Sequence, residues 1–423
     1  MSRRNLNALK SAAAAACLCL SLFGASLAQG DLTGGVGQFA IQPKREKVVA
    51  TAKPKPVVVK RGPRVSASDR LVEAASRGDS AAASAALGKG ANANARSDEG
   101  CPALVYAAAG KNAETAQALL AKGADANAKC ADGVTALMVA AEVGDAATAQ
   151  ALVARGADAN AKTPDGRTAL IFAASKGQLA VVRALLEKGA DANARYKDGR
   201  TALTFAAANG YAEIADALLA KGAEVDTRAD DGWTPLLWAS WFGHADVVKL
   251  LLERGADVKA GDKDKDTALM KAATQGHLAV VQMLLARGAE ADARGNGGGT
   301  ALLFAASRPS GYEMAEALLA KGADVNARND AGLTPLILAA AYGRVPTLDV
   351  LIAKGADVNA RTPKGFTALI AASNKGLANT VKLLIEKGAD VNAQYEDGRT
   401  ALAFAQQNGQ TQVAEILKSA GAQ

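Results

Sequence analysis

The hydrophobic pattern of the chain is one short motif that recurs at intervals of 33 residues, and once 34. In the copy at residues 165–195, apolar side chains and alanines gather in two stretches, 168–175 and 179–187. Gly177 and Gly189 follow these stretches, and glycine can end a helix in the left-handed conformation without a steric penalty. Because such short helices need neighbours to be stable, the pattern predicts stacked helix pairs and not separate globular domains.

A threonine stands where the first helix of most copies begins, and its hydroxyl can cap the first turn. Asp69 and Pro102 take this place at the front, which gives about eleven units in residues 66–423. Residues 66–98 and 396–423 are expected to cap the ends, since a stack of repeats needs polar outer faces. The threonines are Thr135, Thr168, Thr201, Thr234, Thr267, Thr300, Thr334, Thr367 and Thr400.

Two motifs within the copies are informative. Thr-Pro-Leu occurs at 234–236 and 334–336, and Gly-Ala-Asp-Val-Asn-Ala occurs at 322–327, 355–360 and 388–393. In these features the repeats resemble the ankyrin repeat. The resemblance implies an all-α repeat solenoid of helix-turn-helix pairs, each with a projecting β-turn finger. It also implies that a protein partner binds the concave face, which the fingers and first helices form.

Residues 1–28 have the pattern of an export signal: a basic start, an uncharged stretch and small residues at the end. We expect cleavage after Ala28, which would deliver the protein to the periplasm or outside the cell. An uncleaved membrane anchor is the alternative, although the stretch is poorly hydrophobic. Arg3 and Arg4 also fit a twin-arginine signal, and Cys17 is a weaker candidate for lipid attachment.

Residues 29–65 alternate prolines with lysines and show no helical or strand period, so we expect a disordered linker. The net charge of +7 arises from the first 65 residues, which hold eleven lysines and arginines against Asp31 and Glu46, and the repeats are slightly negative. Nucleic acid is therefore not expected as a partner. The basic stretch 44–64 either keeps the linker soluble or binds an anionic polymer of the cell envelope.

The sequence contains no pattern typical of a catalytic or metal site. The two histidines, His244 and His277, follow the glycine between the paired helices and are expected to be structural. No Ser/His/Asp or Cys/His grouping and no Cys-x-x-Cys spacing occurs. We therefore expect no enzyme activity, no cofactor, no metal and no small-molecule substrate.

Cys101 and Cys130 lie on neighbouring fingers, on sides that would face each other in the stack. A disulfide is plausible in an oxidising compartment, and two free thiols are the alternative.

The strongest candidate for partner binding is the repeat that holds all three tryptophans. Trp238 takes a position that is filled elsewhere by phenylalanine and is expected in the core. Trp233, Trp241 and Phe242 replace polar residues of other copies and are typical of an interaction hot spot. Extra packing between fingers is the alternative. Tyr196, Lys197 and Tyr211 could extend this patch.

A basic row lies at the base of the fingers, six residues before each threonine position. It either faces an acidic partner or belongs to a solvated ladder of alternating charges. Its arginines include Arg195, Arg228, Arg294, Arg328 and Arg361.

Residues 259–312 depart most from the repeat, and we expect local looseness there. Lys265 replaces a turn glycine, Lys271 replaces an apolar helix residue, and 295–299 is glycine-rich without the residues of a phosphate loop. One residue is inserted at 308–310.

Taken together, the sequence predicts a monomeric, non-enzymatic scaffold that is exported to the bacterial envelope and binds a protein of unknown identity. Two alternatives are a secreted effector that binds host proteins and a structural tether held to envelope polymer by the linker.

Overall fold

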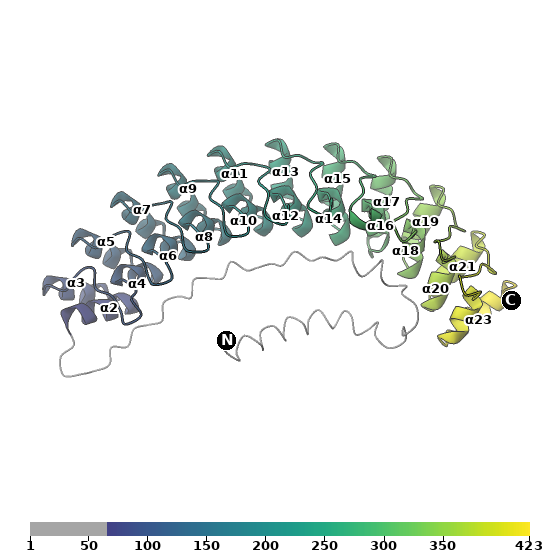
Figure 1. Cartoon of the computed structure of the whole chain (residues 1–423), viewed down its shortest axis with the longest axis horizontal. Coiled ribbons are helices and arrows are strands. Elements are labelled where there is room, and N and C mark those ends of the chain that lie inside the picture. Colours follow the sequence, from purple (N-terminus) through teal and green to yellow (C-terminus); the bar gives the residue numbers. More distant parts are fainter. Residues whose placement is uncertain (1–65) are drawn as a thin grey trace. The chain divides into compact units, whose positions relative to one another are not determined.

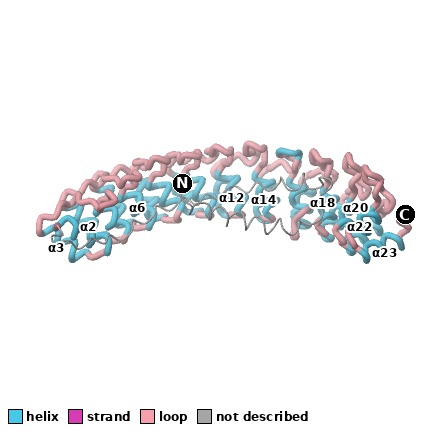
Figure 2. Tube along the Cα trace, turned by 60° about the horizontal axis from the view of Figure 1, so that its bottom comes forward, coloured by secondary structure: helices cyan, strands magenta, loops and turns pink. Residues whose placement is uncertain are grey.

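The computed structural model describes residues 66–423, which form eleven pairs of α-helices stacked side by side (Figure 1). The first helices line the inner side of this curved row and the second helices line the outer side. The loops that join one pair to the next run together along one edge (Figure 2). The predicted all-α repeat solenoid with eleven repeats is therefore confirmed.

Each first helix begins directly after its N-cap residue. They are α2 (Ala67–Arg77), α4 (Ala103–Ala109), α6 (Ala136–Val143), α8 (Ala169–Ser175), α10 (Ala202–Asn209), α12 (Pro235–Phe242), α14 (Ala268–Gln275), α16 (Ala301–Ala306), α18 (Pro335–Ala341), α20 (Ala368–Asn374) and α22 (Ala401–Gln407).

The residue directly after each second helix is a lysine or an arginine, or an alanine after the last one. A glycine in the left-handed conformation comes next. They are α3 (Ser80–Gly88), α5 (Ala113–Ala121), α7 (Ala146–Ala154), α9 (Leu179–Glu187), α11 (Ala212–Ala220), α13 (Ala245–Glu253), α15 (Leu278–Ala286), α17 (Gly311–Ala320), α19 (Val345–Ala353), α21 (Ala378–Glu386) and α23 (Thr411–Ser419).

The threonines cap the first helices as the sequence predicts. Thr168 Oγ1, for example, accepts a hydrogen bond of 3.3 Å from the backbone amide of Ile171. At the front of the array the prediction for Asp69 was wrong by three residues. Ser66 is the N-cap of α2, and the Asp69 carboxylate accepts from the Ser66 amide at 3.0 Å, completing a capping box.

The core is thin because alanines let the paired helices approach closely. Ala173 and Ala174 of α8 are fully buried, as are Ile171 and Phe172 of the same helix. The equivalents of Ile171 in other repeats, Val105, Met138, Leu237 and Met270, are also buried. Apolar packing thus joins the repeats at this position.

The expected signal peptide 1–28, the linker 29–65 and the basic stretch 44–64 lie outside the described residues, as does Cys17. These expectations stay predictions. Within residues 66–423, none of the helices has the length and apolar content needed to cross a membrane.

The stretch 259–312 keeps the paired helices of the repeat but differs from the other repeats in local conformation. Lys265 adopts the left-handed conformation (φ 62°) that Gly232 has one repeat earlier, which is strained for a residue with a side chain. A short 3-10 turn, η2 (Asn296–Gly298), replaces part of a finger, and α16 has only six residues. The looseness that the sequence predicts here stays a prediction.

Candidate protein-binding face

The three tryptophans form one aromatic cluster at α12. The ring centroid of Trp233 lies 4.7 Å from that of Trp238 and 5.9 Å from that of Trp241. Phe242 stacks on Trp238 at 6.0 Å, one turn of helix away. Finger and first helix are thereby joined through aromatic contacts within one repeat.

The cluster is buried, which corrects part of the sequence interpretation. Trp238 is 2% exposed, as expected for a core residue, but Trp233 and Trp241 are only 5% and 7% exposed. Their rings contact each other instead of standing in solvent, so their area already contributes to the fold. Phe242 remains partly exposed, and a partner contact by this ring stays a prediction.

The structure links Tyr196 to the cluster through a residue that the sequence analysis missed. The guanidinium carbon of Arg200 lies 5.9 Å from the centroids of both Tyr196 and Trp238. Arg200 is buried, and its Nε donates to Asp198 at 2.7 Å. Exposed Lys197 extends over Tyr196, with Nζ 5.5 Å from the ring centroid.

Tyr211 takes a different place from the one expected. It directly precedes α11, and its ring packs against Gly177 of the preceding repeat. A Cβ atom added to Gly177 would lie only 2.9 Å from Cζ of Tyr211. Tyr211 therefore packs on the turn between α8 and α9, and its contact there does not involve the aromatic cluster.

Lys271 is a second residue whose role the sequence did not show. It is buried on α14, and its Nζ lies 2.8 Å from Asp262 and 2.9 Å from Asp266. The same Nζ lies 4.7 Å from the Trp233 ring centroid, at cation–π distance. Burial raises the pKa of Asp266, and the charge of Lys271 opposes this shift. The positive charge that replaces an apolar residue at this position is thus balanced by two carboxylates.

The basic row at the base of the fingers is part of the stack. Arg228 donates to the backbone carbonyls of Gly232 at 3.2 Å and Gly261 at 2.7 Å, and so joins two fingers. Arg361 instead pairs with the Asp390 carboxylate at 3.2 Å. The remaining predicted members donate to the carbonyl of the residue 33 or 34 positions later: Arg195 to Arg228, Arg294 to Arg328, and Arg328 to Arg361. The arginines of this row thus join neighbouring fingers through backbone carbonyls, a role that neither alternative from the sequence included, and a contact with an acidic partner stays a prediction.

Asparagines two residues before the basic row form a second ladder between repeats. The Oδ1 atom of each asparagine accepts a hydrogen bond from a backbone amide of the next repeat. Its Nδ2 atom donates to the carbonyl of the glycine that follows the second helix of that next repeat. The ladder is interrupted where the sequence has Asp226, Lys259 and Asp292. The asparagines that make both contacts are Asn94, Asn127, Asn160, Asn193, Asn326 and Asn359.

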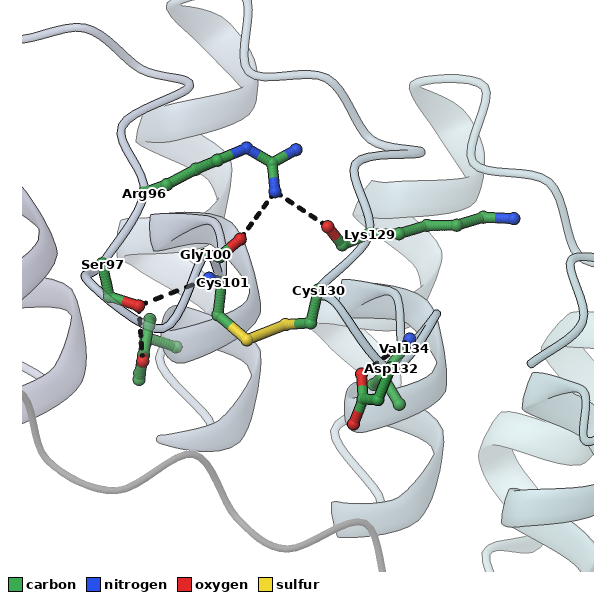
Figure 3. Close-up of a disulfide and its surroundings, with 9 residues drawn as sticks. Arg96, Ser97, Gly100, Cys101, Lys129, Cys130, Asp132 and Val134 are labelled. Atoms are coloured by element: carbon green, nitrogen blue, oxygen red, sulfur yellow. Dashed lines mark hydrogen bonds between the residues drawn. A yellow bond between two sulfur atoms is a disulfide. The ribbon is translucent and has the colours of Figure 1, made fainter. Parts of the chain in front are cut away.

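Cys101 and Cys130 meet between the first two complete fingers (Figure 3). Their Cα atoms are 4.3 Å apart and their sulfur atoms are at disulfide distance. Arg96 spans the same two fingers, since it donates to Gly100 at 2.7 Å and to Lys129 at 2.8 Å. The predicted pairing of the two cysteines is therefore geometrically possible.

Both histidines contact the first helix of the preceding repeat. Nε2 of His244 lies 3.2 Å from the carbonyl of Ala208, and Nε2 of His277 lies 3.0 Å from that of Trp241. Because a carbonyl only accepts, each Nε2 must carry the proton. This is the structural role that the sequence predicts. In the part of the chain that the structure describes, no cluster of three potential metal ligands occurs.

A family model for ankyrin repeats in three copies matches the chain in overlapping segments that together span residues 71–423. The matched segments are 71–163, 114–196, 138–229, 194–262, 259–329, 302–395 and 336–423. No match was found among curated proteins.

Proposed function

Since the chain belongs to the ankyrin repeat family, we propose that it is an exported scaffold of the bacterial envelope which binds a protein on its concave face. Ankyrin arrays generally bind protein partners and are generally not enzymes. The export pattern at residues 1–28 supports the location. The surface would consist of the first helices, which line the inner side of the row (Figure 1), and of the fingers, which run along one edge (Figure 2).

One contrast carries the proposal. The contacts that hold the stack together recur in most repeats, whereas the side chains at the ends of the first helices differ from one repeat to the next. Apolar core positions, threonine caps and arginine and asparagine contacts recur in register. Eight residues after the threonine position, however, the side chain differs in size, charge and polarity between neighbours. The series reads Val143, Lys176, Asn209, Phe242, Gln275, Arg308, Tyr342, Lys375 and Asn408. A varied surface on a uniform frame favours recognition of one particular partner.

A structural tether is the second candidate, because eight lysines and arginines gather in residues 29–65. In that case the linker would bind an anionic envelope polymer and the repeats would serve as a spacer. Deleting residues 29–65 separates the two functions. A tether would lose its association with the envelope, while a scaffold would keep its partner.

The test is a comparison of partner capture by the purified full chain and two variants. Phe242→Ser/Tyr342→Ser changes two partly exposed first-helix ends, and Arg183→Ser/Lys249→Ser changes exposed positions on two second helices. We expect a periplasmic protein to bind the wild type and the second variant saturably and the first variant weakly. Equal capture by both variants, or the absence of any saturable capture, would contradict the proposal. N-terminal sequencing of the exported protein should begin at Gln29.

A further inference from the structure

Two arginines and an exposed tyrosine lie in the turns that follow the C-terminal ends of α16 and α18. Arg308 lies in the turn after α16, within the stretch that makes this repeat one residue longer. Arg344 precedes α19, and its Nε donates to the Ser307 carbonyl at 3.0 Å, which links the turns of two repeats. Its guanidinium carbon lies 5.9 Å from the ring centroid of Tyr342, a side chain that is 37% exposed.

Neither arginine is paired with a carboxylate of residues 66–423. In residues 66–423, the side chain of Arg308 makes no hydrogen bond or ion pair, although it is partly buried. Burial and then the charge of Arg344 lower the pKa of Arg308. Helices α16, α18 and α20 and the turns at 307–310, 342–344 and 375–377 contain no aspartate or glutamate.

Two buried cations of other repeats have carboxylates as partners. Lys271 contacts Asp262 and Asp266, and Arg200 contacts Asp198. Desolvating a charge without a partner is costly, so an unpaired cation at such a place is unusual. Arg308 is such a cation.

We propose that Arg308 and Arg344, with Tyr342 beside them, bind an acidic side chain of a protein segment that docks on the concave face. A guanidinium matches a carboxylate in shape and can form two parallel charge-assisted hydrogen bonds. The exposed tyrosine ring adds apolar contact and a hydroxyl, and tyrosine and arginine are enriched among residues that dominate protein interfaces. This inference rests on the proposed scaffold function and names the chemistry of its partner.

The probe for the test is a random dodecapeptide phage library selected on the immobilised full chain. We expect the selected peptides to be enriched in aspartate or glutamate. A synthetic copy of the best peptide should bind Arg308→Gln about tenfold more weakly, which corresponds to one lost charge-assisted contact. Arg308→Lys should keep part of the affinity, and Arg183→Gln on α9, which makes the same charge change on a second helix, should leave the affinity unchanged.

The melting temperature separates binding from folding. Because the Arg308 side chain makes no hydrogen bond or ion pair with residues 66–423, Arg308→Gln should melt no lower than the wild type. Selected peptides without acidic enrichment, or with equal affinity for Arg308→Gln, would overturn the anchor and leave the scaffold function standing. A failure to select any saturable peptide on the wild type would overturn both. Competition by inorganic phosphate with no peptide dependence on Arg308 would identify a simple anion site and also overturn the proposal.

Discussion

Asn193 Oδ1 accepts a hydrogen bond of 2.8 Å from the backbone amide of Glu224 in the next repeat. The Nδ2 of the same side chain donates to the Gly222 carbonyl at 2.9 Å. One amide group therefore satisfies a donor and an acceptor of the neighbouring loop, and it fixes the spacing of two repeats. One repeat later, Asp226 can only accept, and it does so from the Asp257 amide at 3.1 Å.

We predict that Asp226→Asn stabilises the array. The new amide would keep the contact to Asp257 and add a donor toward the Gly255 carbonyl, as Asn193 does toward Gly222. One such hydrogen bond contributes about 0.5–1.5 kcal/mol to the free energy of unfolding. Chemical denaturation measures the change, and Asn193→Asp is the matched control, which should lower stability by a similar amount.

The gain from Asp226→Asn should depend on pH. Burial raises the pKa of Asp226 above its ordinary value of 3.8, so the unfolded chain loses this proton first as the pH rises. The wild type therefore loses stability as the pH rises through this interval, and the variant does not. The difference between them should be larger near about pH 7 than near about pH 3. An equal difference at both values would contradict the role of the charge.

Lys271→Met should strongly destabilise the middle of the array. The change leaves the buried carboxylate of Asp262 and the partly buried one of Asp266 without their cation, and breaking a buried pair costs about 3–5 kcal/mol. Protonation removes that cost, so the stability of the variant should approach that of the wild type as the pH falls through the raised pKa of Asp266.

A compensated variant supplies the control for this prediction. Asp262→Asn/Asp266→Asn/Lys271→Met removes all three charges and should recover much of the lost stability at neutral pH. Hydrogen exchange at residues 259–312 would show at the same time whether this stretch opens more readily than its neighbours. Protection equal to that of residues 165–195 would contradict the predicted looseness.

Trp233→Ala should act mainly on stability, because this ring is 5% exposed and packs on Trp238 and Trp241. Truncating a buried tryptophan costs about 3–5 kcal/mol. Phe242→Ala, at a partly exposed position, should cost less and should weaken partner capture at a temperature where both proteins are folded. A smaller loss of unfolding free energy for Trp233→Ala than for Phe242→Ala would contradict this division of roles.

In exported protein we expect Cys101 and Cys130 to be joined. Their Cα atoms are 4.3 Å apart with a sequence separation of 29, and a cross-link across a loop of this size stabilises by about 2–4 kcal/mol. Mass spectrometry should show the gain of two hydrogens on reduction. Cys101→Ser should melt lower than the oxidised wild type and match the reduced one. Full alkylation without prior reduction would show that the thiols are free.

The repeat could be identified from the sequence because its signals are local. A threonine cap such as Thr168, a glycine such as Gly189 and the apolar positions between them depend only on the helix that contains them. The structural role of His277 could also be inferred, since its place after the glycine between helices is set by the repeat. The core position of Trp238 followed from the phenylalanines that fill the same place in other copies.

Burial and pairing between repeats could not be read in the same way. Trp233 and Trp241 replace polar residues of other copies, and only the packed structure shows that their rings contact each other. The sequence likewise places Lys271 at an apolar position without showing that Asp262 and Asp266 reach it. The finger arginines look like a free charged row until their contacts to the next finger are seen.

The sequence by itself determined the fold family, the number of repeats and the ends of the helices, because each of these follows from a period of 33 residues and from local capping. The tertiary structure decided which side chains remain available for a partner. That depends on contacts across repeats, which bury Trp233 and engage Arg228 but leave Tyr342 exposed and Arg308 without a carboxylate. Which side chains a partner can reach is therefore set by the stacking of the repeats and cannot be read from one repeat alone.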